Sequence, residues 1–440
     1  MPQKINSTVK IFVLGCLLVL ENGCKKDSVF QYPPKPIVVI NAGDSRLKAD
    51  EIHFVKDSVY ILATNIIIDS GKKIVIDAGT LVKVTPSIYI SIQGGAEIQS
   101  NGTKDLPVIF TSSSTKGRQG LSTYDGTWDG IRIYGNASGK SSGNINYTRV
   151  EFAGVYQSAV LLNNVSKATA INNVQVSFSF FYSSFEFNGG NVNAGNLVSY
   201  ACAGSDFTIS NGYKGNLQNL LAYRHPSFSN GGSANVGGVD IKDEGTLPVI
   251  SNLTVMGPSQ KYPNSTNYYL GNPNRRAAII TSINSKFFIR NAAIIDYPFR
   301  AYYLDSYNTS RALEIGQADI SYSVFYHADT SKAFYIPFGI YPPYVSADLK
   351  IFLLREKYHN ELLENPSQSI LADPYNYFDG IPNPTPVAGS PLLTGANFSD
   401  SAGRYNDPFF NKVGYRGAIG ADNWLAGWVN FIPLQTDYNN

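Results

Sequence analysis

An asparagine recurs at a fixed spacing in the middle of the chain, each time directly before a short apolar run. Asn173, Asn196 and Asn219 are 23 residues apart and stand in INNVQVSF, AGNLVSYA and LQNLLAYR. Asn252 and Asn291 repeat the pattern at the longer spacings of 33 and 39 residues, so we expect loop insertions there. A repeat of this size cannot bury its own apolar face and must stack on its neighbours. The spacing therefore predicts stacked coils of a parallel β-helix.

These asparagines suit the bend between two strands of a coil. Asparagine adopts left-handed backbone dihedrals more readily than most residues. Because stacked coils repeat at a rung spacing of about 4.8 Å, the amides of successive asparagines can hydrogen-bond to one another. We therefore expect Asn173, Asn196, Asn219, Asn252 and Asn291 to form a structural ladder rather than to bind a ligand.

The composition favours one long β-rich domain. The 440-residue chain has 29 Tyr and 24 Phe but only 3 Trp, which is typical of extracellular β-structure. A length prior of roughly 150 residues per domain would predict about three domains, but a solenoid grows along one axis and escapes that estimate. The formal net charge of +2, with no run rich in Lys and Arg, argues against a nucleic-acid partner. We expect a monomer.

The first 23 residues have the features of a lipoprotein signal peptide. A basic start precedes the apolar run Ile11–Leu20, which is too short to span a bilayer, and Gly23 stands directly before Cys24. The stretch Gly23-Cys24-Lys-Lys-Asp resembles the lipoprotein signals of Bacteroidetes, in which the cysteine is acylated and the following charges favour surface display. The resemblance implies a lipid anchor on Cys24 in the outer membrane of a Gram-negative bacterium. A secreted protein with an unprocessed cysteine is the alternative.

Three further segments follow the signal peptide 1–23. The Pro-interrupted segment 24–50 predicts an extended tether. Short β-branched runs split by Gly, Asn and Asp predict the β-helix over 51–340. Residues 341–440 predict an irregular C-terminal cap. Lipidation of Cys24 would leave Cys202 as the lone thiol, which we interpret as a small buried apolar residue rather than a nucleophile.

The predicted cap contains one helix. Apolar residues recur at helical spacing within Leu349–Pro366, which indicates a helix there. The last coil of a solenoid presents unpaired strand edges and apolar side chains. We therefore expect the helix, the Pro-rich segment 381–386 and the segment of Trp424 and Trp428 to cover this open end, rather than to form a separate domain.

Three motifs near the start of the coils resemble bacterial surface proteins with right-handed parallel β-helix repeats. In those proteins a Gly-Thr pair opens a strand, a Gly-Thr-x-x-x-Pro turn leads into the next, and Trp-x-Gly-Ile starts a third. The chain matches with Gly79-Thr80, with Gly102-Thr103 before Pro107, and with Trp128 to Ile131. The resemblance covers nearly all of the mature chain. It implies an all-β, right-handed single-stranded parallel β-helix of the pectin-lyase-like superfamily, and no particular chemistry.

The best local candidate for chemistry is the Gly-flanked, carboxylate-rich segment Gly237–Thr246. The pectate-lyase-like resemblance implies acidic residues that hold calcium and a basic residue that takes a proton, and Asp240, Asp243 and Glu244 are the candidate calcium ligands. Clustered carboxylates of this kind are also common as solvated turn residues. The candidate set, including basic residues from the coils before and after, is Arg224, His225, Asp240, Lys242, Asp243, Glu244, Arg275 and Arg276.

Three functions remain open from the sequence. The first is a non-enzymatic surface lipoprotein whose β-helix binds an extracellular glycan or protein. The second is a calcium-dependent polysaccharide lyase or glycoside hydrolase acting at Asp240–Glu244, and the third is a structural or adhesive stalk. The chain lacks the paired aspartates and Arg-x-Lys arrangements of polysaccharide-cleaving β-helices, which favours the first. The four histidines lack the i, i+4 spacing of a zinc site, so no cofactor beyond calcium is expected.

Overall fold

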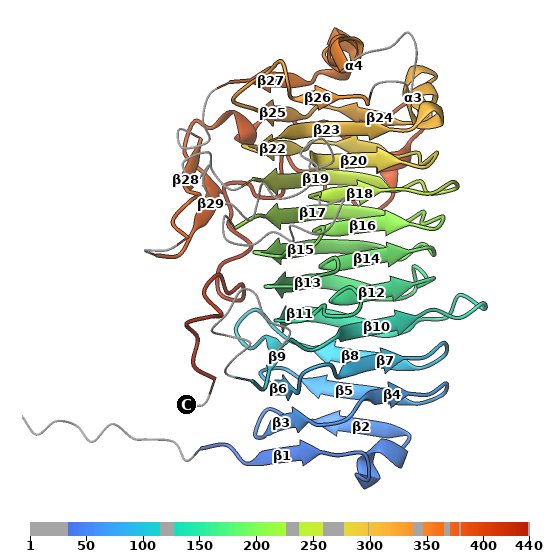
Figure 1. Ribbon diagram of the computed structural model, residues 1–440, viewed down its shortest axis with the longest axis vertical. Coiled ribbons are helices and arrows are strands. Elements are labelled where there is room, and N and C mark those ends of the chain that lie inside the picture. The colour runs from blue at the N-terminus through green and yellow to red at the C-terminus, as the bar shows by residue number, and fades with distance from the viewer. Residues whose placement is uncertain are drawn as a thin grey trace, which may run out of the picture. The chain divides into compact units, whose positions relative to one another are not determined.

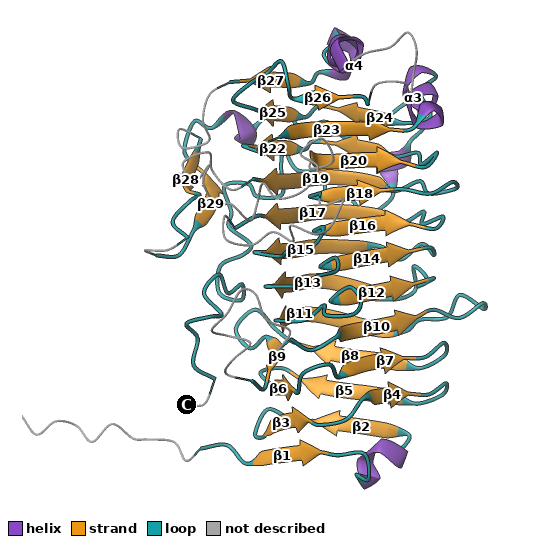
Figure 2. Ribbon diagram, in the orientation of Figure 1, coloured by secondary structure: helices purple, strands orange, loops and turns teal. Residues whose placement is uncertain are grey.

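Parallel strands stacked rung upon rung form two long sheets in this computed structural model (Figures 1 and 2). Among the described residues, sheet A has 17 strands and sheet B has 10. All the coils belong to the unit Pro36–Thr436, to which the following description applies. The structure describes residues 34–114, 127–225, 237–257, 277–297, 299–337, 346–364, 370–377 and 380–438.

Sheet B takes one short strand from each coil, and every pairing in it is parallel. Its strands are β4 (Ile66–Ile68), β7 (Tyr89–Ile92), β10 (Gly130–Tyr134), β12 (Val160–Asn163), β14 (Phe185–Asn188), β16 (Phe207–Ser210), β18 (Val239–Ile241), β20 (Ala277–Ser282), β23 (Arg300–Asp305) and β26 (Phe334–Tyr335).

Sheet A takes two strand segments from each coil, with a bend between them. In the first coils the segments are separate strands: β1 (Ile37–Ile40), β2 (Glu51–Phe54), β3 (Val59–Leu62), β5 (Lys73–Asp77), β6 (Leu81–Val84), β8 (Glu97–Asn101) and β9 (Val108–Ser112). In the middle coils one long strand contains both: β11 (Gly143–Glu151), β13 (Ala170–Ser177), β15 (Ala194–Tyr200), β17 (Asn216–Tyr223) and β19 (Val249–Met256). The last coils separate them again: β21 (Phe288–Arg290), β22 (Ala293–Ile295), β24 (Asp319–Ser321), β25 (Val324–Tyr326) and β27 (Glu361–Leu363).

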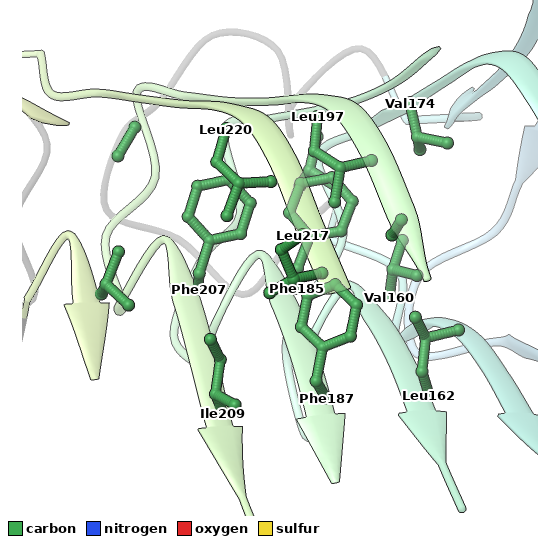
Figure 3. Close-up of a cluster of buried hydrophobic side chains, with 14 of the residues drawn as sticks. Val160, Leu162, Val174, Phe185, Phe187, Leu197, Phe207, Ile209, Leu217 and Leu220 are labelled. Atoms are coloured by element: carbon green, nitrogen blue, oxygen red, sulfur yellow. The ribbon is translucent and has the colours of Figure 1, made fainter. Parts of the chain in front are cut away.

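Alternation of side chains along each strand directs one apolar face to the inside of the coil. Figure 3 shows Phe185 and Phe207 from sheet B pointing toward Leu197 and Leu220 from sheet A. All four side chains are completely buried, and the two phenylalanine rings stack with their centroids 5.3 Å apart on adjacent rungs. Burying a side chain of this size stabilises the fold by about 1.5–3 kcal/mol, so the repeated column is the main source of stability.

The architecture confirms the predicted fold class, a right-handed parallel β-helix. In the described part of the chain the only α-helices are α3 (Tyr307–Glu314) and α4 (Ser346–Leu353). Neither is long and apolar enough to cross a membrane. Coil strands begin at Ile37, within the segment predicted as a tether, and continue to Leu363, within the predicted cap.

The recurring asparagines occupy the bend between the two halves of sheet A. Asn173, Asn196, Asn219, Asn252 and Asn291 have φ angles of 54, 54, 56, 55 and 58°. The Asn196 amide donates to Oδ1 of Asn173 over 3.1 Å, and the Asn219 amide donates to Oδ1 of Asn196 over 2.8 Å. The left-handed bend and the amide ladder are therefore two consequences of one residue type at one position.

The amide ladder does not extend to the last two asparagines. Asn252 donates instead to the carbonyl oxygens of Tyr415 and Gly417, and Oδ1 of Asn291 accepts from the backbone N–H of Asn397. At these rungs the C-terminal part of the chain offers backbone partners within reach. The direct amide ladder is interrupted there by bonds to that segment, and Asn291 reaches the preceding rung through Ser251 Oγ instead.

The C-terminal segment, residues 370–377 and 380–436, lies along the outer face of sheet A (Figure 1). The side-chain amide of Gln175 pairs with the backbone N–H and C=O of Asn430 at 2.8 and 2.7 Å. The amide of Gln218 pairs in the same way with Asn411, also at 2.8 and 2.7 Å. Each glutamine thus presents the donor and acceptor that a neighbouring strand would present.

A second core lies between this segment and sheet A, outside the coils. It is distinct from the coil interior and contains outward side chains of the second half of sheet A together with residues of the C-terminal segment, among them Tyr200, Tyr223, Ile295, Ile419, Leu425 and Trp428. Its members are nearly all buried. Because these outward positions are apolar, sheet A needs a cover on its outer face.

The expected cap is therefore corrected in two respects. The Trp428 ring lies 5.6 Å from that of Tyr147, in the middle of the β-helix, and the Pro-rich segment lies in the hairpin of β28 (Leu371–Asp373) and β29 (Asn383–Pro386). The helix predicted over Leu349–Pro366 ends at Leu353. Its residues Leu349 and Leu353 are buried in the coil core, so α4 is the element that closes it. Trp424 and Trp428 therefore cover the apolar outer face of sheet A and not the open end of the coils.

Two glycines of the sequence motifs are required by close backbone approach. Gly130 has a φ of 108°, and a Cβ there would lie 2.4 Å from the carbonyl oxygen of Ala159. A Cβ on Gly102 would lie 2.1 Å from the carbonyl oxygen of Tyr147. Any larger residue would push adjacent coils apart, which explains why these motifs carry glycine.

Replacement of Asn196 separates the two roles of the ladder. We expect Asn196→Ala to lower the free energy of unfolding by about 3 kcal/mol, because it removes two amide hydrogen bonds and strains a left-handed residue. Asn196→Gly keeps the left-handed bend and should lower it by only about 1–2 kcal/mol. Denaturant unfolding measures both, with the exposed neighbour Asn172→Ala as the control. A wild-type stability of Asn196→Gly would show that the amide bonds contribute nothing.

Candidate functional site

The predicted segment Gly237–Thr246 is not one loop. It contains strand β18 of sheet B, followed by a turn that leads to sheet A. Val239 and Ile241 are completely buried and belong to the coil core, so Asp240 between them faces outward. Asp243 takes a left-handed φ of 73° in the turn, and Glu244 follows it at an exposed position.

Asp240 is a buried carboxyl group on the outer face of sheet B. The residue is 4% exposed, and its register partners are Thr208 on β16 and Ile280 on β20. Lys242 Nζ is 3.8 Å from its Oδ2. Burial raises the pKa of Asp240 to about 6, and the nearby lysine only partly opposes this. A carboxyl group in this setting can hold a proton close to neutral pH.

Glu186 is a second carboxylate on the same outer face, and the sequence analysis missed it. It pairs in register with Thr208, which pairs with Asp240, so the two acidic residues are two rungs apart. Ser158 donates a hydrogen bond to Glu186 Oε2 over 2.6 Å. The available signal was the alternation in β14, where Phe185 and Phe187 face inward and Glu186 must face outward.

Arg224 has a structural role in the connections between coils. Its Nε lies 2.9 Å from Asp206 Oδ2, and both side chains are completely buried. Its guanidinium also donates to the carbonyl oxygens of Cys202, Gly204 and Gly237 at 2.8, 2.7 and 2.6 Å. Burial raises the pKa of Asp206 to about 6, although Arg224 acts in the opposite direction. With these contacts the guanidinium cannot reach a ligand in solvent.

His225 is buried among aromatic rings. His225 is 7% exposed and packs against the rings of Tyr200 and Tyr377, with centroid distances of 6.4 and 5.0 Å. Burial lowers the pKa of His225 to about 4, so it is neutral at pH 7. Arg275 and Arg276 lie outside the described residues.

Cys202 is a completely buried free thiol, as its sequence context predicted. Burial raises its pKa, so the thiol stays protonated. This environment is that of a small core residue.

The structure does not bring the three candidate calcium ligands together. Asp240 lies on the face of sheet B, Asp243 Oδ2 accepts from the backbone N–H of Asn211 over 3.2 Å, and Glu244 points to a separate groove. Within the ranges that the structure describes, no three His, Cys, Asp or Glu residues are close enough to share a metal ion.

That groove, which we call the turn groove, opens where the turns from sheet B to sheet A meet α3. Its volume is about 520 Å³. Its polar lining consists of Lys214, Glu244, Thr246, Asn284, Lys286, Asn308, Arg311 and Gln317. Three cationic groups, three amides, one hydroxyl and one carboxylate thus line a single open space, and Glu244 is the member that the sequence analysis had singled out.

Hydrogen bonds hold part of this lining in place. Asn308 Nδ2 donates to Asn284 Oδ1 over 2.9 Å, and Lys286 Nζ donates to Gln317 over 2.5 Å. Arg311 is paired with Glu314 on α3. Amide, ammonium and carboxylate groups together can donate to and accept from hydroxyl groups, so the groove suits a polar, uncharged or anionic ligand.

The fold and these outward faces define a parallel β-helix of the pectate-lyase-like class. The family described as pectate-lyase-like beta helix domain matches residues 46–330, which is more than half of the chain. The chain therefore belongs to this family. No curated protein and no solved structure matches it.

The raised pKa of Asp240 makes a prediction for stability against pH. Between about pH 4 and 6 the folded state keeps a proton that the unfolded chain releases, so this group's contribution to the free energy of unfolding falls as pH rises. We expect Asp240→Asn to stabilise the fold by about 2 kcal/mol at pH 7 and to match the wild type near pH 4. Denaturant unfolding at several pH values tests this, with the exposed Asp105→Asn as the control. A gain that is constant with pH would contradict it.

Proposed function

We propose that this protein is a non-enzymatic surface lipoprotein whose β-helix binds an extracellular glycan in the turn groove. The observation that carries the proposal is the lining of that groove. Asn284 and Asn308 are fixed to each other beside exposed cations and Glu244 in an open space of about 520 Å³. Sugar hydroxyls both donate and accept hydrogen bonds, and this combination of groups offers both.

The surface location rests on the sequence of the N-terminus. Cys24 lies outside the described residues, and the Gly23-Cys24 pair after the apolar run Ile11–Leu20 supports acylation there. A Pro-containing stretch before β1 would then extend the coils away from an outer-membrane surface.

Acylation can be tested directly at the two N-terminal cysteines. We expect a labelled fatty acid to be incorporated into the wild-type protein and into Cys16→Ala, but not into Cys24→Ala, because only Cys24 follows the cleavage site. The Cys24→Ala protein should also leave the outer-membrane fraction. Labelling of Cys24→Ala, or its retention in that membrane, would refute the anchor.

Glycan binding is tested with the full chain in detergent micelles on an array of extracellular polysaccharides, with and without calcium. We expect at least one polysaccharide to be retained intact. The double variant Glu244→Ala/Asn308→Ala should bind it about fivefold more weakly, because each lost polar contact contributes roughly 0.5 kcal/mol.

The exposed pair Asn172→Ala/Glu356→Ala, away from the groove, is the matched control and should bind like the wild type. Equal weakening in both double variants would place the site elsewhere. Absence of any retained polysaccharide would favour a protein partner or a stalk.

A glycoside hydrolase is the second candidate, favoured by Glu186 and Asp240 on one face. Two rungs put their Cα atoms about 10 Å apart, and inverting glycosidases hold their two carboxyl groups roughly 6.5–9.5 Å apart. With its raised pKa, Asp240 would protonate the leaving oxygen while Glu186 takes a proton from the attacking water. Shortened products in the binding experiment, lost in Asp240→Asn and kept in Asp243→Asn, would establish this function instead.

A further inference from the structure

Exposed cations stand in single file along the edge where sheet B turns into sheet A. They occur in the turns that follow β10, β12, β16 and β20, and the file ends on α3. We call them the basic ridge, and they are Lys140, Lys167, Lys214, Lys286 and Arg311. The last three line the turn groove, so the ridge extends this groove along the solenoid.

Hydrogen bonds between successive turns show that these turns stack on one another. Ser166 Oγ donates to the Lys140 carbonyl, and the Lys167 N–H donates to Oδ1 of Asn191. The Lys214 N–H donates to the carbonyl of Gly190, one turn below. The Leu247 N–H donates to the carbonyl of Tyr213, and the Lys286 N–H donates to the carbonyl of Thr246. Each of these hydrogen bonds joins one rung to the next. At about 4.8 Å per rung, neighbouring cations are roughly 5–10 Å apart along the axis.

The N-terminal part of the ridge, from Lys140 to Lys214, carries only positive charge in its turns. The turn segments 135–142, 164–169, 189–193 and 211–215 contain no aspartate or glutamate. Acidic side chains occur in the turn that follows β18, which contains Asp243 and Glu244, and on α3, where Glu314 pairs with Arg311. Of these, Asp243 accepts a hydrogen bond from the backbone N–H of Asn211 in the turn of Lys214. At the N-terminal end of the ridge, Lys140 lines a second groove in which the carboxylates of Asp50, Glu51 and Glu97 stand beside Lys72 and Lys73, so the charge there is mixed.

We propose that the basic ridge binds a linear anionic polysaccharide laid parallel to the solenoid axis, with its carboxylate or sulfate groups on the lysines. The inference rests on the proposed glycan function and names the class of glycan. Amide side chains are interspersed with the cations at Asn191 and Asn284, where the hydroxyl groups of the sugars can hydrogen-bond.

A single file of cations fits a linear polymer better than other polyanions. Duplex nucleic acid carries phosphates on two strands and requires a wider basic surface. Single-stranded nucleic acid is held by aromatic side chains on which bases stack, whereas Tyr213 in these turns is completely buried. A plane of lipid headgroups would contact a broad patch rather than a line one residue wide.

The test compares the full-length wild type with Lys167→Glu/Lys214→Glu/Lys286→Glu, and with the neutral version in which the same lysines become Gln. The matched control is Lys104→Glu/Lys357→Glu/Lys412→Glu, which changes the net charge equally at exposed positions off the ridge. The probes are alginate, carboxyl-reduced alginate as its neutral counterpart, and phosphatidylglycerol vesicles. The thermal unfolding midpoint of each variant verifies that it is folded.

We expect alginate to bind more tightly than its neutral counterpart and to weaken as salt rises. The ridge Glu variant should lose about tenfold or more in affinity, the Gln variant somewhat less, and the control triple should lose less than twofold. Equal binding of charged and neutral polymers would overturn the ridge while leaving the glycan function intact. Equal losses in the ridge and control triples, or binding of vesicles without alginate, would also overturn it. Failure of every polysaccharide to bind would refute the proposed function itself.

Discussion

Contact between successive rungs is the constraint on which this structure depends: the apolar column supplies most of the stability, and side-chain amides fix the register at the bend of the middle coils. In a solenoid each coil contacts only its neighbours, so the register must be fixed locally at every rung. The pairs Asn173–Asn196 and Asn196–Asn219 do this at the bend. On the outer face of sheet A, the side-chain amides of Gln175 and Gln218 hydrogen-bond to the backbone of the C-terminal segment. Each amide donates to a C=O and accepts from an N–H, as the backbone of an additional strand would. One functional group thus sets both the stacking of the coils and the cover on sheet A.

The coils could be predicted from the sequence because their signal is periodic. An asparagine that must take a left-handed bend and pair with its counterpart leaves a visible spacing, and inward apolar residues leave a visible alternation. The path of the C-terminal segment leaves neither. Gln175 lies 255 residues from Asn430 and has the character of an ordinary outward polar residue of a strand. Only the folded coils bring the Gln175 amide next to Asn430. The sequence therefore gives no sign that Trp424 and Trp428, which precede Asn430, lie on the outer face of sheet A rather than on the open end.

The candidate site was predictable only in part, for a similar reason. Asp240 looked like a loop residue because glycines flank a strand of three residues, too short to show alternation by itself. Arg224 looked available because charge suggests solvent, but Asp206 and three carbonyl oxygens from neighbouring connections bury it. Glu186 carries no motif at all. Its importance appears only when register places it two rungs from Asp240.

The turns that lead from sheet B to sheet A are the positions where side chains can be substituted at the lowest cost in stability. Inward residues are held by the coil core, and the outer face of sheet A is held by the C-terminal segment, so substitutions in either disturb packing. Lys167, Lys214 and Lys286 are exposed, and their replacement changes no buried contact. The backbone hydrogen bonds nevertheless fix the rung repeat, so the spacing of the backbone positions that carry these cations is set by the solenoid, and only the lysine side chains can adjust to a ligand. A partner of the ridge must therefore match the repeat of the solenoid, and selectivity would follow from the spacing of its charges rather than from the shape of a closed pocket.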